Sequence, residues 1–178
     1  MTAEIRVTLD DDSRRRADDI LGQLAEKASN VEGGLRNVGE ALLRTTGERF
    51  DTETDPAGQP WAPLQLTTIM QRGGSGHILT VSGRLRRSIS YEVSGATLRL
   101  GPNTVDAAAH QFGSTHEIRA KAGKALSVPI IGPRGFTRIS LKAVIVTIPA
   151  RPYIGFGRKD EEAAREAVEE WLEVEPAN

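Results

Sequence analysis

A stiff connector at residues 50–64, with the sequence FDTETDPAGQPWAPL, constrains the fold more than any other segment of this chain. An Asp-Pro pair fixes φ for a turn, and Gly58 can adopt a positive φ. Two prolines flank Trp61 and favour extended geometry in the residues that precede them. The connector contains no plausible pair of nucleophile and base. We therefore expect it to define shape, with Trp61 as the wedge that locks the preceding helix onto a sheet.

Composition limits the kinds of protein that this chain can be. Its 178 residues fit one domain, and with only 4% aromatic residues we expect neighbouring subunits to supply part of the stability. The absence of cysteine excludes disulfides, zinc–thiolate sites and thiol nucleophiles, and fits synthesis in a reducing cytoplasm. The longest apolar run is far shorter than the ~20 residues of a membrane span, so we expect a soluble protein.

Hydrophobic periodicity predicts a single α+β domain over residues 1–178. We expect a small, mostly antiparallel sheet packed by N-terminal and C-terminal helices. Residues 1–30 should form a strand, alternating at Ile5, Val7 and Leu9, and then a helix with its apolar face on Ala17, Ile20, Leu21, Leu24 and Ala28. The further expected elements are helices at 31–50, 66–71, 84–87, 106–111 and 158–174, a hairpin at 89–100, and a protruding β-hairpin at 117–149 that turns at 132–135.

The helix predicted at residues 31–50 is unusual in its glycine content. It contains Gly33, Gly34, Gly39 and Gly47, each of which costs roughly 1 kcal/mol relative to alanine in a helix. Tertiary packing must therefore stabilise this helix, because its intrinsic propensity is low.

Charge is distributed unevenly along the chain. Residues 72–142 contain eleven Lys or Arg against three acids, a balance of +8, whereas residues 158–178 contain three against eight, a balance of −5. Such polarity suits head-to-tail contacts between copies, or an acidic partner for the middle region. The alternative is that solvated loops and a solvated helix face simply differ in charge.

The sequence predicts no catalytic, cofactor or metal site. A glycine after Phe112 interrupts the helix between His110 and His116, so the two imidazoles do not share a helical face as in a zinc motif. The GGSGH stretch at residues 73–77 lacks both the second glycine of a nucleophile elbow and the lysine of a phosphate loop. The Asp10–Asp12 run lacks the spacing and the glycine of a calcium loop.

A dense basic group at Arg84, Arg86 and Arg87 is the strongest candidate for an interaction surface. It could meet phosphates or an acidic surface of a protein partner. No aromatic residue interleaves with these arginines, which argues against nucleic acid as the main target. A solvated helix face without a partner is the alternative.

Four local patterns occur in order along the chain: the connector at 50–64, ILTVSGRLRRSI at 78–89, LGP followed by AAAHQFG at 100–113, and IPARPYIGF at 148–156. Together they resemble the phage virion morphogenesis family, the tail completion proteins of Mu-like and related long-tailed phages. The resemblance covers roughly residues 35–175.

This resemblance implies a non-enzymatic virion protein of the phage neck, made in the host bacterial cytoplasm. It implies a homo-oligomeric ring, which we expect to be a hexamer, at the head-proximal end of the tail, where it enables head–tail joining. The implied partners are other copies, the tail terminator and tube, and the head connector, whereas DNA passes through the ring unread and no membrane is involved. The alternatives are a head-side connector or adaptor, and a DNA-binding accessory protein that uses residues 72–142.

Within that framework, two sets of residues are candidates for specific roles. We expect Phe112 to pack inward and Arg151, Pro152 and Tyr153 to fix the angle between the β excursion and the last helix. The candidate structural residues are Trp61, His110, Phe112, Arg151, Pro152 and Tyr153. The candidate protein-interface residues are Arg84, Arg86, Arg87, Arg119, Lys121, Lys124, Arg134 and Arg138.

Overall fold

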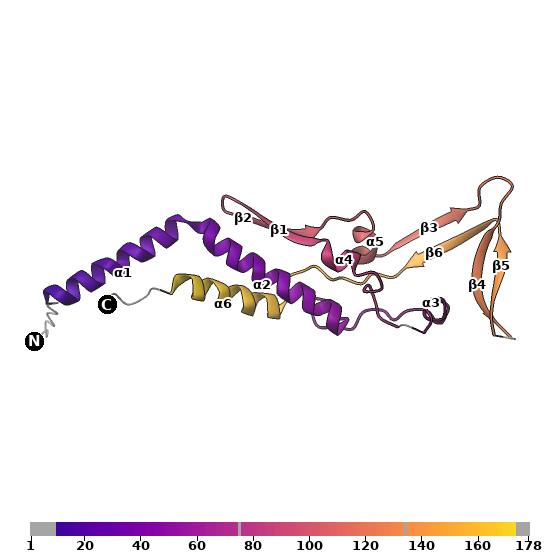
Figure 1. The fold of residues 1–178 in the computed structure, drawn as a ribbon, viewed down its shortest axis with the longest axis horizontal. Helices are drawn as coiled ribbons and strands as arrows, with labels where there is room; N and C mark the ends of the chain where they lie inside the picture. The colour runs from indigo at the N-terminus through magenta and orange to yellow at the C-terminus, as the bar shows by residue number, and fades with distance from the viewer. Residues whose placement is uncertain (1–9, 75, 134, 174–178) are drawn as a thin grey trace, which may run out of the picture.

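A computed structural model describes residues 10–74, 76–133 and 135–173 of the chain. The molecule is elongated and built from helices and short antiparallel ribbons (Figure 1). The predicted α+β class is confirmed, while the strand expected at Ile5–Leu9 and the candidate Arg134 lie outside the described residues. The helices are α1 (Asp11–Ser29), α2 (Val31–Thr52), α3 (Leu66–Gln71), α4 (Arg84–Arg87), α5 (Ala107–Phe112) and α6 (Arg158–Leu172). The strands are β1 (Ile89–Ser94), β2 (Thr97–Pro102), β3 (Ser114–Arg119), β4 (Leu126–Gly132), β5 (Gly135–Leu141) and β6 (Ala143–Ile148).

The first two helices are separated by Asn30. The carboxylate of Asp10 caps α1 by accepting from the amide of Ser13 at 2.6 Å, and the side chain of Asn30 caps α2 by accepting from Gly33. Helix α1 then points away from the rest of the molecule (Figure 1). None of its residues is buried, and Leu21 on its expected apolar face is 63% exposed.

Helix α2 is the central packing element, lying against the β1–β2 hairpin and against α6. Two of its glycines are the points of closest approach. A Cβ on Gly34 would lie 2.9 Å from the ring of Trp171, and a Cβ on Gly39 would lie 2.5 Å from the ring of Tyr91. These two glycines therefore admit one aromatic ring from each neighbouring element, which explains why a glycine-rich helix is stable here.

The connector packs into the main core. Trp61 is 5% exposed, and its ring meets that of Phe50 edge-on at 5.5 Å between centroids. The indole Nε1 donates to the carbonyl of Pro152 at 2.8 Å. Trp61 thus fixes the end of α2 to the segment that leads into α6, rather than to a sheet. The buried residues of this core are Phe50, Trp61, Ile78, Leu85, Ile89, Ala107 and Tyr153.

A buried ion pair between Arg49 of α2 and Asp160 of α6 completes this junction. The guanidinium also donates to the carbonyl of Tyr153 at 2.9 Å, and the carboxylate accepts from the hydroxyl of Thr45 at 2.5 Å and from the amide of Gly157 at 2.7 Å. Every oxygen of the carboxylate therefore has a donor, as a buried charge requires.

Residues 114–148, which we call the arm, leave the core as two successive two-stranded ribbons. Strand β3 pairs with β6, and β4 pairs with β5, both antiparallel. The predicted hairpin excursion with its turn at 132–135 is confirmed, but its strands are not continuous, because residues 120–125 and Lys142 interrupt the ladders between the two ribbons. Figure 1 shows the β4–β5 ribbon turned steeply away from the β3–β6 ribbon at the far end of the molecule.

Candidate assembly interface

The two faces of the β4–β5 ribbon differ: Ile131 and Phe136, which are 48% and 39% exposed, share one face with polar residues, whereas the other face is mainly aliphatic. Alternation along the strands, combined with the pairing of Val128 opposite Ile139, places six side chains on this face. They are Leu126, Val128, Ile130, Thr137, Ile139 and Leu141. None of them is buried, and Ile139 is 37% exposed. Leu126, Val128, Ile130 and Leu141 are half-buried and α3 lies near β4, so this face is partly covered and partly exposed.

The β3–β6 ribbon repeats the pattern. Its register places Ile118 with Val144, Val146 and Ile148 on one face, together with Ser114 and His116. The other face is mostly polar but includes Ile145, which is 71% exposed. No described residue of the arm is buried, and each described ribbon has only two strands. The outer edges of all four strands therefore retain unpaired backbone groups, which favours addition of a strand from another chain.

The base of the arm corrects one expectation from the sequence. Phe112 was expected to pack inward, but it is 79% exposed. Helix α5 ends at Gly113, where φ is 75° and a Cβ would lie 2.9 Å from the amide of Ala150. The chain therefore approaches the 148–150 segment with glycine at the contact, and the phenyl ring is left on the surface. Phe112 adds to the exposed apolar surface near the arm.

Gln111 holds the base of the arm to the core. Its Oε1 accepts from the amides of Tyr153 and Ile154, each at 3.1 Å, and its Nε2 donates to the carbonyl of Ile154 at 2.7 Å. The hydroxyl of Tyr153 in turn donates to the carbonyl of Ala107 at 3.1 Å. Burial raises the pKa of Tyr153 to about 12, so this phenol stays protonated.

Arg151 joins three segments in the same region. Its Nε donates to the carbonyl of Ala62 at 2.7 Å, its Nη2 donates to the carbonyl of Pro63 at 3.1 Å, and its backbone amide donates to the carbonyl of His110 at 2.8 Å. The side chain links the connector to α5 just where the chain returns from the arm. Arg151 and Tyr153 therefore lie where they can orient the arm relative to the core.

The candidate basic residues on α4 each have an acceptor within the chain. Arg84 pairs with Asp106 at 2.8 Å, Arg86 binds both carboxylate oxygens of Asp51, and Arg87 donates to the carbonyl of Ser82 at 2.9 Å. The sequence did not reveal these carboxylates, since they are distant along the chain.

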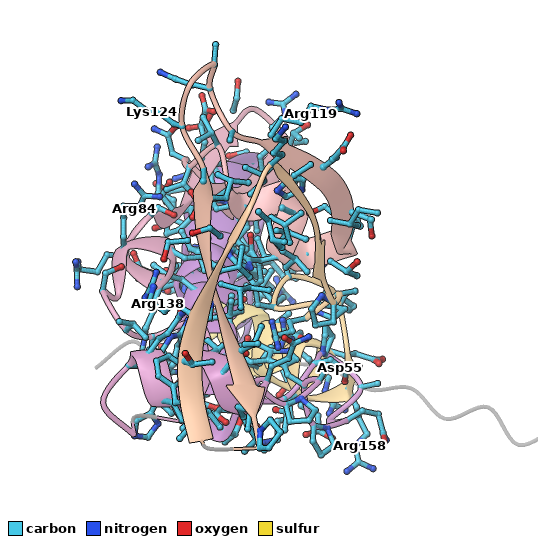
Figure 2. The ribbon with its side chains drawn as sticks, turned by 90° about the vertical axis from the view of Figure 1, so that its right-hand side faces the viewer. Asp55, Arg84, Arg119, Lys124, Arg138 and Arg158 are labelled. Atoms are coloured by element: carbon cyan, nitrogen blue, oxygen red, sulfur yellow. The ribbon has the colours of Figure 1, made fainter. Side chains whose placement is uncertain are left out.

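The basic candidates of the arm are scattered. Arg119 pairs with Glu117 at 2.7 Å, Arg138 donates to the side chain of Ser127 at 2.8 Å, and Lys121 and Lys124 lie in the turn between the ribbons. Figure 2 shows Arg119 and Lys124 at one end of the arm, with Arg138 further along the ribbon and Arg84 to its side. The candidates therefore do not form one continuous patch.

Two classes of site are absent from the described ranges 10–74, 76–133 and 135–173. These ranges contain no cluster of three or more His, Asp or Glu side chains placed to hold a metal ion. No helix in them has the length and apolar character needed to cross a membrane.

Comparison with known proteins identifies the family. The chain matches the phage virion morphogenesis family over residues 12–173, which includes both long helices, the core and the whole arm. The chain belongs to the phage virion morphogenesis family. The resemblance found in the four sequence patterns is thereby confirmed.

The phage virion morphogenesis protein described here also has a curated relative. This relative is the "Putative capsid assembly protein G" of Escherichia phage Mu. The two proteins are 27% identical over 138 residues, which cover 75% of this chain and 74% of the relative. No solved structure matches the chain. Family and relative together assign this virion morphogenesis protein a structural or assembly role in a bacteriophage. The exposed apolar arm is the part of the fold best suited to that role.

Proposed function

We propose that this protein is a non-enzymatic tail completion protein, which forms a homo-oligomeric ring at the head-proximal end of the phage tail and enables head–tail joining. One observation supports this most: each ribbon of the arm carries an apolar face, yet none of the arm's described residues is buried. A two-stranded ribbon is marginal in water and gains stability when its apolar face is covered. In an assembly protein, a neighbouring subunit supplies that cover.

A head-to-tail ring provides such a cover for every copy. Contacts between unlike surfaces close into a ring when the rotation per subunit permits it. The arm lies at one end of the elongated molecule and α1, which contributes no buried residue, lies at the other (Figure 1). We propose that the arm of each copy packs on the next copy and that the ring is a hexamer.

The ring would lie between the tail and the head, with the tail terminator, the tube and the head connector as its neighbours. The internal ion pairs of Arg84, Arg86 and Arg119 reduce the positive charge that the protein presents to DNA. This supports a ring through which DNA passes without being read, over a DNA-binding accessory protein. We propose that the α4 arginines face a protein partner.

Electron micrographs of particles assembled without this protein test the proposal. If the protein completes the tail, filled heads should accumulate beside free tails of normal length, and adding the purified protein should restore joining. Native mass spectrometry of the purified protein should show a closed oligomer.

Other results would point elsewhere. Abnormally long tails would indicate loss of length control, and filled heads that leak DNA would indicate a head-side connector. Either result would contradict tail completion.

A further inference from the structure

A recess of about 210 Å³ lies between the connector, the segment before α4, helix α5 and the chain that returns from the arm. Its polar lining is mostly cationic. Arg72, Arg84 and Arg151 contribute guanidinium groups and His110 contributes an imidazole, against the single carboxylate of Asp106, which is already paired with Arg84. The recess therefore has an excess of positive charge within the described residues.

Arg151 is the residue that makes this excess significant. It is 6% exposed, the same as Arg49, but the two differ in their partners. Arg49 is paired with Asp160, whereas the hydrogen bonds of Arg151 within the described residues go to the carbonyls of Ala62 and Pro63. Burial lowers the pKa of Arg151, the charge of Arg72 lowers it further, and the carboxylate of Glu53 raises it. No carboxylate among the described residues pairs directly with Arg151, so an anion entering the recess would stabilise this buried cation.

His110 gives a second, independent indication. Its Nδ1 is buried and has no hydrogen-bond partner among the described residues. Burial lowers the pKa of His110, so its imidazole is neutral at pH 7 and can carry its proton on Nδ1. A buried donor of this kind requires an acceptor. Because solvent does not reach Nδ1, an oxyanion in the recess would contact it only after the ring turns, whereas the three arginines already line the recess.

We propose that this recess binds a carboxylate, supplied in the assembled ring by an acidic side chain on α6 of a neighbouring copy. The source rests on the proposed ring, whereas the carboxylate site itself does not. A single acidic side chain fits a recess of this volume, whereas the backbone of a DNA duplex is too bulky to enter it. Helix α6 and its C-cap residue together offer six exposed acids, Glu161, Glu162, Glu166, Glu169, Glu170 and Glu173.

Acetate binding tests the site in the isolated protein. In an NMR titration with sodium acetate, at ionic strength held constant with chloride, the His110 ring signals should shift and saturate. Arg72→Gln, which removes one guanidinium from the rim, should weaken acetate binding about tenfold, and Arg72→Lys should retain part of it. Arg99→Gln, on the exposed face of β2 outside the recess, is the matched control and should change nothing.

Several outcomes would overturn the site. The proposal is wrong if acetate shifts these signals no more than chloride does, or if Arg72→Gln binds acetate as the wild type does. Inorganic phosphate that binds more than tenfold tighter than acetate would reassign the recess to a phosphate group, and hence to nucleic acid.

A charge exchange between copies tests the source of the carboxylate. Arg72→Glu should prevent ring formation, and one of six single Glu→Arg changes on α6 should restore it. Acetate binding without such a restoring change would overturn α6 as the source. A wild-type protein that binds acetate but forms no ring would contradict the proposed function and leave the carboxylate site standing.

Discussion

Arg49 and Asp160, which are 111 residues apart in the sequence, form a buried ion pair that fixes the end of α2 to the start of α6. Their side chains are 7% and 1% exposed, so solvent screens the pair very little. Because the arm ends at Ile148, only twelve residues before Asp160, this pair also fixes the base from which the arm extends.

Removing one partner should be much more harmful than replacing both. We expect Asp160→Asn to lower the free energy of unfolding by about 3–5 kcal/mol, because it leaves Arg49 charged and buried. The double variant Arg49→Met, Asp160→Leu should recover a large part of that loss. Urea denaturation monitored by circular dichroism measures both. A loss below about 1 kcal/mol in Asp160→Asn would show that the pair is not the main tie between the two helices.

Two glycines on α2 should respond in opposite ways to the same substitution. Gly39→Ala places a methyl group against the ring of Tyr91 and should destabilise the protein by about 1–3 kcal/mol. Gly47→Ala meets its nearest atom, on Arg86, at 3.8 Å and should stabilise the protein by up to about 1 kcal/mol, since alanine is the better helix former. Denaturant midpoints of the two variants, measured side by side, would show equal shifts if this packing were wrong.

Stability should fall at alkaline pH because of Tyr153. Its pKa is raised from 10.0 to about 12 in the folded protein, since burial disfavours the phenolate. The unfolded chain therefore releases this proton at a lower pH than the folded chain does. The stability that Tyr153 contributes is fully present below pH 10 and should be lost as pH rises from about 10 to about 12.

Spectroscopy separates Tyr153 from the other tyrosine. A hydrogen bond to Glu40 raises the pKa of Tyr91 as well, so both phenols should titrate late by ultraviolet absorbance. Tyr153→Phe should remove the highest step and flatten the fall in stability above pH 10, whereas Tyr91→Phe should leave that step in place. A Tyr153 step at the ordinary tyrosine pKa would contradict the burial of this side chain.

Local patterns in the sequence were sufficient to predict most helices and the β1–β2 hairpin, because the period of apolar residues and the turn at Gly95 are local signals. The pairs that hold the elements together were not predictable in this way. Nothing near Arg49 indicates Asp160, and a glycine in a helix does not reveal which aromatic ring will approach it. Asp160 did have one local signal, since it stands three residues after Gly157 and accepts from its amide at 2.7 Å.

The arm was predicted in outline and wrong in detail. Alternation continues from Ile139 to Ile148, so the sequence conceals the interruption at Lys142 where the ribbon turns. The sequence also did not reveal that the apolar side chains of the arm are exposed. An alternating strand has the same pattern whether its apolar face packs on its own core or on another subunit. The basic candidates were chosen from sequence density, and the carboxylates that pair with Arg84 and Arg86 are distant along the chain. The roles proposed for them therefore remain predictions.

The central claim is that the apolar face of the arm joins copies of this protein into a working neck ring. Val128 and Ile139 are paired on that face, and Ser127 and Ser140 are the neighbouring pair on the opposite face. The double variant Val128→Asp, Ile139→Asp should still fold, since neither residue is buried. It should lose the contact between copies, because that contact depends on burying the apolar face. Ser127→Asp with Ser140→Asp is the matched control.

The most direct measurement is the fraction of heads joined to tails, counted in electron micrographs of a phage that lacks its own copy of this protein and receives one of these variants. The account predicts joined virions with the serine-pair control, and filled heads beside separate tails with the Val128→Asp, Ile139→Asp protein. Normally joined virions with the latter would contradict it.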